Sequence, residues 1–361
     1  MTAIHQVVPT LAGRDAVGQH TLQIQRLLHD RGVTSHILTE HTPAPELRQL
    51  ARPYQSFGSD PSDADAVLLY QASTGSMLVD WLLDRSQPVL VNYHNVTPAE
   101  FFESWEPLVS AELRVGRMQI EELAPITEFA IADSQYNASE LDEFGYRAST
   151  VVPILLDVSD FDHAPDPRTI ETIGRRKQAG GTEWLFVGRV APNKCQHDLI
   201  KAFAYYRAVI DPNAHLTLVG RSSSARYRDA LGTFVRNLGL EGAITFPDSV
   251  TPGALTAYYQ YADVFVCASE HEGFCVPLLE AMYHQLPIVA FDAAAVPATL
   301  GSGGLVVQTK APAFFAEAVA RVVQDTDLRA QLMAAGTGRL ADFALSRTRD
   351  EMFEALEPWC A

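Results

Sequence analysis

The feature that most constrains this chain is a regular alternation of short, β-branched apolar runs with longer amphipathic stretches. Such alternation is typical of βα units, whose strands form mainly parallel sheets. The series occurs twice, on either side of a break rich in Asp, Pro, Gly and Arg at residues 153–181. A chain of 361 residues also exceeds the size at which one hydrophobic core usually keeps growing. The sequence therefore predicts two α/β domains with a linker in that break.

We expect a strand at the start of each βα unit. In the first half these strands are residues 4–9, 34–39, 66–70, 88–94, 129–133 and 150–154. In the second half they are residues 184–187, 216–219, 244–247, 264–267, 287–291 and 304–307. A last helix is too short to form a domain and needs a partner surface. The predicted domains are residues 1–155, with a helix at about 346–361 packing back on them, and residues 156–345.

The composition excludes several classes of protein. A formal net charge of −17 argues against a general nucleic-acid binder, which needs an excess of Lys and Arg on one face. Residues 1–150 contain no lysine, so a polybasic face for an anionic membrane is not indicated there. No apolar run approaches the roughly 20 residues of a membrane-spanning helix, and the first residues do not resemble a secretion signal. We expect a soluble, cytoplasmic protein.

Four cysteines without a CxxC pair fit a chain in a reducing cytosol rather than a disulfide scaffold. Cys195 and His197 are two residues apart, but no second pair of this kind completes a zinc site. We therefore interpret both as loop residues and assign no metal.

A glycine loop follows the first predicted strand and opens the first predicted helix. In LAGRDAVGQH, Gly18 would let the backbone approach a pyrophosphate, whose charge is favoured by free N–H groups at a helix start. The spacing is not GxGxxG, which argues against a nicotinamide site. A plain strand-to-helix turn remains the alternative, in which Asp15 is a turn residue.

Two cations follow the first strand of the second half, in VGRVAPNK. Arg189 offers forked hydrogen bonds and Lys194 a mobile point charge, so together they could hold a diphosphate leaving group without a metal. The alternative is that both are solvated surface cations.

Two glutamates eight residues apart, Glu272 and Glu280, follow the strand predicted at 264–267. If Pro277 begins a helix, Glu280 lies in its first turn, where a carboxylate suits the helix dipole and can reach a ligand. Glu272 would lie in the preceding loop. The alternative makes Glu280 a capping residue and Glu272 a solvated charge.

Taken together, EGFCVPLLEAM, the following QLPIVAFD, and GRVAPNKCQHDLIKAF resemble family 4 of the retaining glycosyltransferases. LTLVG and ITFPDSVTPGALTAYYQYADVFVCAS extend the resemblance over most of the second half. The first half is similar more loosely, through the loop at Gly18, Tyr93-His94-Asn95 and Ala132-Asp133-Ser134. The resemblance implies the GT-B fold, in which two Rossmann-like domains face each other across a cleft.

The resemblance also implies roles for individual residues. Arg189 and Lys194 look like the cations that hold the donor diphosphate, Glu280 like the ligand of the nucleotide ribose, and Glu272 like the contact to sugar hydroxyls. The remaining residues implied are backbone groups at Gly273, Phe274, Cys275 and Val276 for sugar and phosphates, Ser249 and Val250 for the base, Gly18 opposite them, His94 near the donor sugar, and Asp15 near the acceptor or sugar. Where the family often has a glutamate shortly after this helix, the chain has Ala298.

The activity implied is transfer of a hexose, with retention, from a nucleotide-diphosphate sugar to an unidentified glycan, lipid-linked glycan or small metabolite. UDP and GDP donors are both open, and no cofactor is expected. The resemblance implies an oxocarbenium-like transition state, with the leaving phosphate deprotonating the acceptor. No carboxylate stands out as a nucleophile. Two alternatives remain: a non-catalytic subunit that binds nucleotide sugar, and a sugar-nucleotide epimerase of the same fold.

Overall fold

The computed structural model describes residues 2–13 and 15–360, and the chain divides into two compact units. Unit 1 comprises the residues up to Glu100, then Leu108–Leu156, and the end of the chain from Phe343. Unit 2 comprises Phe101–Pro107 and Asp157–Asp342. Within the described ranges, no helix has the length and apolarity needed to cross a membrane.

Unit 1 is built on a seven-stranded parallel sheet with the order β3-β2-β1-β4-β5-β6-β7. The strands are β1 (Ile4–Val8), β2 (Ile37–Thr39), β3 (Ala51–Pro53), β4 (Val67–Ala72), β5 (Val89–Tyr93), β6 (Thr127–Ala132) and β7 (Ser149–Val151). The sequence pattern predicts all of them except β3. That strand is a short edge segment containing Arg and Pro, which carries no apolar alternation.

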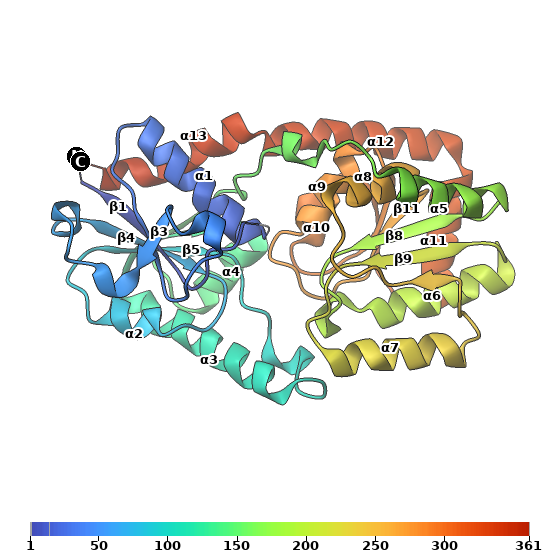
Figure 1. Cartoon of the computed structure of the whole chain (residues 1–361), viewed down its shortest axis with the longest axis horizontal. Coiled ribbons are helices and arrows are strands. Elements are labelled where there is room, and N and C mark those ends of the chain that lie inside the picture. The colour runs from blue at the N-terminus through green and yellow to red at the C-terminus, as the bar shows by residue number, and fades with distance from the viewer. Residues whose placement is uncertain (1, 14, 361) are drawn as a thin grey trace. The chain divides into compact units, whose positions relative to one another are not determined.

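Helices cover both faces of this sheet (Figure 1). They are α1 (Ala16–Asp30), α2 (Leu78–Leu83), α3 (Pro107–Leu123), α4 (Gln135–Glu143) and α13 (Leu345–Leu356). On one face, Ile24 and Leu28 of α1 share a core with Met352 and Leu356 of α13, and α1 and α13 lie side by side. On the other face, α2, α3 and α4 pack their apolar sides over β4 and β5.

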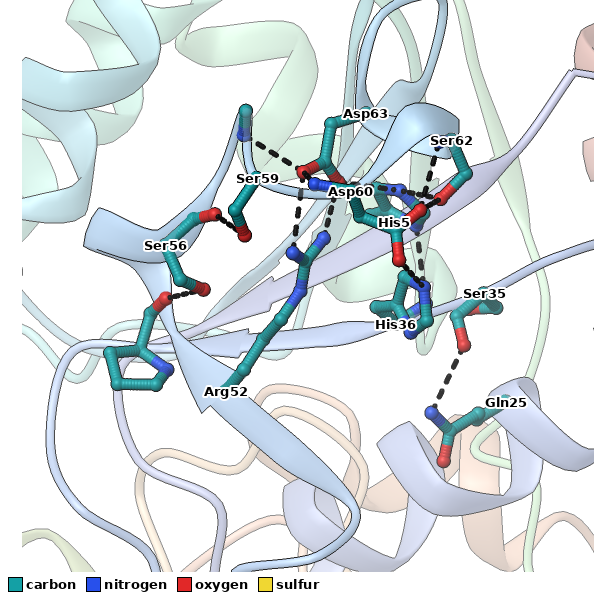
Figure 2. A network of polar contacts seen from close by, with 12 residues as sticks. His5, Gln25, Ser35, His36, Arg52, Ser56, Ser59, Asp60, Ser62 and Asp63 are labelled. Atoms are coloured by element: carbon teal, nitrogen blue, oxygen red, sulfur yellow. Dashed lines mark hydrogen bonds and ion pairs between the residues drawn. The ribbon is translucent and has the colours of Figure 1, made fainter.

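A polar network fastens the edge of this sheet, as Figure 2 shows. Arg52 of β3 pairs with Asp63 in the short 3-10 helix η3 (Pro61–Asp63), and Asp63 also accepts the N–H of Gly58 at 2.8 Å. His5 of β1 also contacts this carboxylate, with its Nε2 at 3.1 Å from Asp63 Oδ1. The backbone N–H of His36 donates to His5 Nδ1 at 3.2 Å. Side-chain pairing therefore holds β3 where the apolar pattern is absent.

Unit 2 repeats the architecture with a six-stranded parallel sheet of order β10-β9-β8-β11-β12-β13. Its strands, all predicted from the sequence, are β8 (Glu183–Val187), β9 (His215–Val219), β10 (Ile244–Thr245), β11 (Val264–Cys267), β12 (Ile288–Phe291) and β13 (Leu305–Val307). Its helices are α5 (Pro167–Gln178), α6 (Gln196–Val209), α7 (Ala225–Asn237), α8 (Pro252–Tyr261), α9 (Val276–Tyr283), α10 (Val296–Leu300), α11 (Pro312–Gln324) and α12 (Thr326–Leu340). The fully buried Trp184 and Phe203 anchor the core under α6, α7 and α11.

Two features of unit 2 differ from the prediction or were not foreseen. The predicted linker at 153–181 contains the regular helix α5, which Asp166 caps through the N–H of Thr169 at 2.8 Å. The sequence pattern does not predict α5, because the helix is mostly polar and Ile173 is its only buried residue. The segment Phe101–Pro107 also belongs to unit 2, where the Trp105 ring packs edge-on against Tyr227 at 5.0 Å between centroids.

Candidate functional site

The strand order of unit 2 reverses between β8 and β11, which are neighbours in the sheet. In open parallel sheets, ligands bind beyond the carboxyl ends of the strands at such a reversal. The two segments that leave these ends are residues 188–195 after β8 and residues 268–275 after β11. The cation and glutamate motifs of the sequence therefore occupy the place where this architecture positions a ligand.

These two segments are fastened to each other. The N–H of Glu270 donates to the carbonyl of Asn193 at 2.9 Å, and the Asn193 amide donates to the carbonyl of His271 at 3.1 Å. The Lys194 ammonium lies 2.6 Å from Glu272 Oε2, with both side chains 12–13% exposed. The predicted diphosphate cation and the predicted sugar contact thus form one half-buried ion pair.

Arg189 lies at the start of the first segment and is exposed. Among the described residues, no ion pair involves its guanidinium, while its backbone carbonyl accepts from the Gln196 side chain at 2.9 Å. The charge of Arg189 is therefore available to an anion. Lys194, by contrast, already pairs with Glu272.

Glu280 lies in the second turn of α9, because the helix begins at Val276 rather than Pro277. The expectation that it lies in the first turn is wrong. The Tyr259 hydroxyl donates to Glu280 Oε2 at 2.6 Å, and burial raises the pKa of Glu280 although that hydrogen bond opposes the shift. A carboxylate in such surroundings costs folding free energy, which indicates a role other than stability.

The predicted backbone site at residues 273–276 forms the start of α9. Cys275 adopts a left-handed conformation with φ of 74°, and this turn leads the chain into the helix. The first N–H groups of a helix lack intrahelical acceptors and favour anions. Thr299, beside Ala298 in α10, donates to the carbonyl of Phe274 at 2.6 Å. The helix α10 therefore supports this segment through Thr299, without a carboxylate at Ala298.

Ser249 and Val250 lie in the segment between β10 and α8, at the same end of the sheet as the other loops of unit 2. Ser249 is exposed and Val250 half-buried. Nearby, the carbonyl of Pro247 accepts the N–H of Gly220 at 3.0 Å, which ties this segment to the end of β9.

In unit 1, Gly18 lies in the first turn of α1, and its N–H donates to the Asp15 side chain at 2.6 Å. Asp15 is therefore the N-cap of α1. A Cβ added at Gly18 would lie 1.7 Å from the carbonyl oxygen of Ala12, so only glycine fits there. The close approach that requires glycine is to the chain itself. Arg14, in the same loop, is outside the described residues.

His94 follows β5 and points into the interior of unit 1, with its side chain 1% exposed. Its Nδ1 lies 2.7 Å from Asp133 Oδ2 and its Nε2 lies 2.6 Å from Gln71 Oε1. Burial raises the pKa of Asp133, and His94 opposes that shift. Both ring nitrogens are thus bonded within unit 1, which matches a satisfied histidine at a strand end.

The structure brings together Arg189, Lys194, Glu272 and residues 273–276 around one end of the unit 2 sheet. It places Asp15, Gly18 and His94 at the corresponding end of the unit 1 sheet. Sequence reasoning missed Asn193 and Tyr259, which position Lys194 and Glu280. Their contacts join residues far apart in the chain, and no local spacing signals them.

Comparison with known proteins gives one family match and several relatives. Residues 172–339 match the family model described as Glycosyl transferases group 1. A protein named D-inositol 3-phosphate glycosyltransferase from Actinosynnema mirum is 30% identical over 265 residues, covering 69% of this chain and 62% of that protein. Its namesake from Corynebacterium glutamicum strain R is 31% identical over 154 residues, covering 41% of this chain and 36% of that protein. The chain spans less than two thirds of the length of these curated relatives.

Solved structures resemble the chain over nearly its whole length. Anabaena HepE in complex with UDP-glucose has a TM-score of 0.75 at 18% identity, covering 99% of this chain and 100% of that chain. Sucrose-phosphate synthase from Thermosynechococcus elongatus has a TM-score of 0.74 at 18% identity, covering 99% of each. At these identities the likeness concerns the fold alone. It confirms the predicted fold class, an α/β chain of GT-B type.

Proposed function

Because its residues 172–339 match the Glycosyl transferases group 1 family model, we propose that this protein transfers a hexose, with retention, from a nucleotide-diphosphate sugar to an acceptor. The observation that carries the proposal is the Lys194–Glu272 pair at the strand reversal of unit 2, with Glu280 partly buried nearby. A cation for phosphate and two carboxylates for hydroxyls are the groups that a nucleotide sugar needs.

In the proposed donor complex, the diphosphate binds Arg189 and replaces Glu272 as the partner of Lys194. The Glu272 carboxylate, which lies 2.6 Å from Lys194 in the donor-free protein, is then free to accept hydroxyl groups of the sugar. Glu280 accepts the ribose hydroxyls while Tyr259 holds its other oxygen. Donor binding thus replaces the Lys194–Glu272 ion pair with contacts of Lys194 to the diphosphate and of Glu272 to the sugar.

The proposed chemistry is departure of the diphosphate from the sugar. Arg189, Lys194 and the N–H groups at the start of α9 stabilise the charge that develops on the leaving group, and this electrostatic term supplies most of the acceleration without a metal. The leaving phosphate deprotonates the acceptor. His94 has both ring nitrogens engaged, so we propose that it acts by holding the end of β5 rather than by proton transfer.

The first test is a thermal-shift panel with UDP, GDP, ADP, dTDP and their common sugar conjugates. A ligand that binds only the folded state stabilises it by about 3 kcal/mol at a hundred times its dissociation constant. We expect one nucleotide class to raise the Tm. Turnover is then measured with the matching donor and a set of acceptors, including the D-inositol 3-phosphate of the relatives' name. No response to any nucleotide would favour the non-catalytic alternative.

The second test compares Lys194→Ala with Lys201→Ala. Lys201 is on α6, 44% exposed, and pairs with Asp198, so it controls for the loss of a nearby lysine. We expect Lys194→Ala to raise the Kd for the donor by about tenfold or more, as for a charge-assisted hydrogen bond lost, and Lys201→Ala to leave it unchanged. Equal Kd values for both variants would contradict the assignment of Lys194.

A further inference from the structure

Two cysteines and one glutamate meet at the junction of β11 and α9. Cys267 ends β11, Cys275 precedes α9, and Glu272 lies in the segment between them. The two Sγ atoms and a carboxylate oxygen of Glu272 all lie within 4.8 Å of one another. Tetrahedral Zn²⁺ with bonds of about 2.3 Å to sulfur and about 2.0 Å to oxygen needs only slightly closer separations. Such bonds place the ligand atoms about 3.5–3.8 Å apart, so the three atoms must approach one another by about 1 Å at most.

The chemistry of the three groups fits a soft divalent cation. Thiolate ligands select Zn²⁺ and similar ions over Mg²⁺ or Ca²⁺. The hydrogen bond between the two thiols lowers the pKa of Cys267, whereas the same bond, together with burial, raises the pKa of Cys275. Cys267 and Cys275 are 1% and 7% exposed, whereas the Glu272 side chain is 13% exposed, so a cation would reach the site from the Glu272 side. Binding would release the thiol protons to solvent.

Two other clusters among the described residues have a similar spacing but unsuitable chemistry. The cluster at Cys195 offers only one thiol, and its Asp198 carboxylate already pairs with Lys201 at 2.9 Å and with Lys310 at 2.7 Å. At His20, both ring nitrogens are engaged, because Nδ1 accepts the N–H of Leu155 at 2.8 Å and the Asn92 amide nitrogen lies 2.7 Å from Nε2. Neither competes with the cysteine pair at β11.

We propose that Cys267, Glu272 and Cys275 form a binding site for a soft divalent cation of the Zn²⁺ type. The cation takes the Glu272 carboxylate away from Lys194, which lies 2.6 Å from it in this structure. It also ties the segment before α9 to the end of β11. The site therefore competes with the contacts proposed for the donor, and this consequence, unlike the site itself, rests on the proposed function.

The test is a Co²⁺ titration of the full-length, reduced protein without nucleotide, followed by absorption spectroscopy. We expect sulfur-to-cobalt charge-transfer absorption that saturates at one ion per chain and is bleached by Zn²⁺. Cys267→Ser and Cys275→Ser should each lower the charge-transfer absorption and weaken binding by about tenfold or more. Cys195→Ser and Cys360→Ser, which alter the other cysteines, should leave the titration unchanged.

Glu272→Gln keeps both thiols and changes a partly exposed side chain, so it tests the site even if a serine variant fails to fold. It should retain the charge-transfer absorption while weakening Co²⁺ binding. The proposal would be overturned if the parent protein showed no charge-transfer absorption. It would also be overturned if Glu272→Gln and both serine variants titrated like the parent, or if Cys195→Ser lost the charge-transfer absorption. Because these spectra need no nucleotide, they stand or fall separately from the glycosyltransferase proposal. Because the cation and the donor sugar both need the Glu272 carboxylate, Zn²⁺ should reduce the extra rise in Tm that a nucleotide sugar gives over its free nucleotide diphosphate.

Discussion

At the scale of single residues, the candidate site contains a carboxylate in surroundings that disfavour its charge and so reduce the stability of the fold. Glu280 is a carboxylate whose pKa is raised by burial, although it accepts a hydrogen bond from the Tyr259 hydroxyl. A group with a raised pKa destabilises the folded state as the pH rises through that pKa, because folding then requires an unfavourable buried charge. An amide at this position would avoid that cost and still accept the Tyr259 hydrogen bond.

We therefore predict opposite effects of Glu280→Gln on stability and binding. The Tm at neutral pH should be unchanged or higher, because a buried charge is removed. The Kd for the nucleotide identified in the thermal-shift panel should rise by about tenfold or more, because the ribose hydroxyls lose a charged acceptor. Tyr259→Phe is the matched variant, which removes the hydrogen bond and keeps the carboxylate. A fall in Tm with unaltered binding in Glu280→Gln would refute the functional role.

At the scale of secondary-structure elements, side-chain hydrogen bonds and ion pairs hold short strands that lack an alternating apolar pattern. His5 connects β1 to η3, and burial, followed by the charge of His36, lowers its pKa from 6.5 to about 4. Its Nδ1 accepts the His36 N–H, so the ring must be neutral with the proton on Nε2, which faces Asp63 (Figure 2). Protonation would break the contact between β1 and the start of β2.

This geometry predicts a specific acid sensitivity of unit 1. The neutral ring contributes fully above pH 6.5, and the contribution is lost as the pH falls toward 4, for a total of about 3 kcal/mol. In His5→Gln this part of the pH dependence should be missing from urea unfolding measured between those pH values. His163→Gln, at an exposed position, should retain it. An identical pH profile in His5→Gln and the parent would show that His5 does not titrate in this way.

At the scale of the whole molecule, chain order and unit membership do not coincide. The helix α13 follows unit 2 in the chain but buries Met352 completely in the core of unit 1. Conversely, Phe101–Pro107 interrupts unit 1 in the chain but belongs to unit 2, where Glu106 accepts the Ser224 hydroxyl at 2.7 Å. Each unit is therefore completed by a segment that is remote in sequence.

Amide hydrogen exchange should show that α13 stabilises unit 1 and that Phe101–Pro107 stabilises unit 2. Met352→Ala should lower the stability of unit 1 by about 2–4 kcal/mol and reduce amide protection in β1 and β4, but not in β8 and β9. Trp105→Ala should do the reverse and reduce protection in α7, against which the indole packs. Glu354→Ala, on the exposed side of α13, is the control and should change neither unit. Equal loss of protection in both units from Met352→Ala would contradict the division.

The sequence by itself determined the fold class and most strands. Local periodicity encodes both, because a strand such as β8 or β11 is a short apolar run bounded by polar residues whatever it pairs with. The sequence also indicated the two motifs at the strand reversal, because each motif is one continuous stretch of residues directly after its strand, β8 or β11. It could not indicate β3, which Arg52 and Asp63 hold in place by a pair between separate elements.

Only the tertiary structure decided which groups meet. Three contacts depend on how neighbouring strands place the loops and helices that adjoin them: Lys194 with Glu272, Tyr259 with Glu280, and Cys267 with Cys275. The burial of His94, with both ring nitrogens bonded, depends in the same way on β4 and β6. Such contacts follow from strand order and register, which no local stretch of sequence contains.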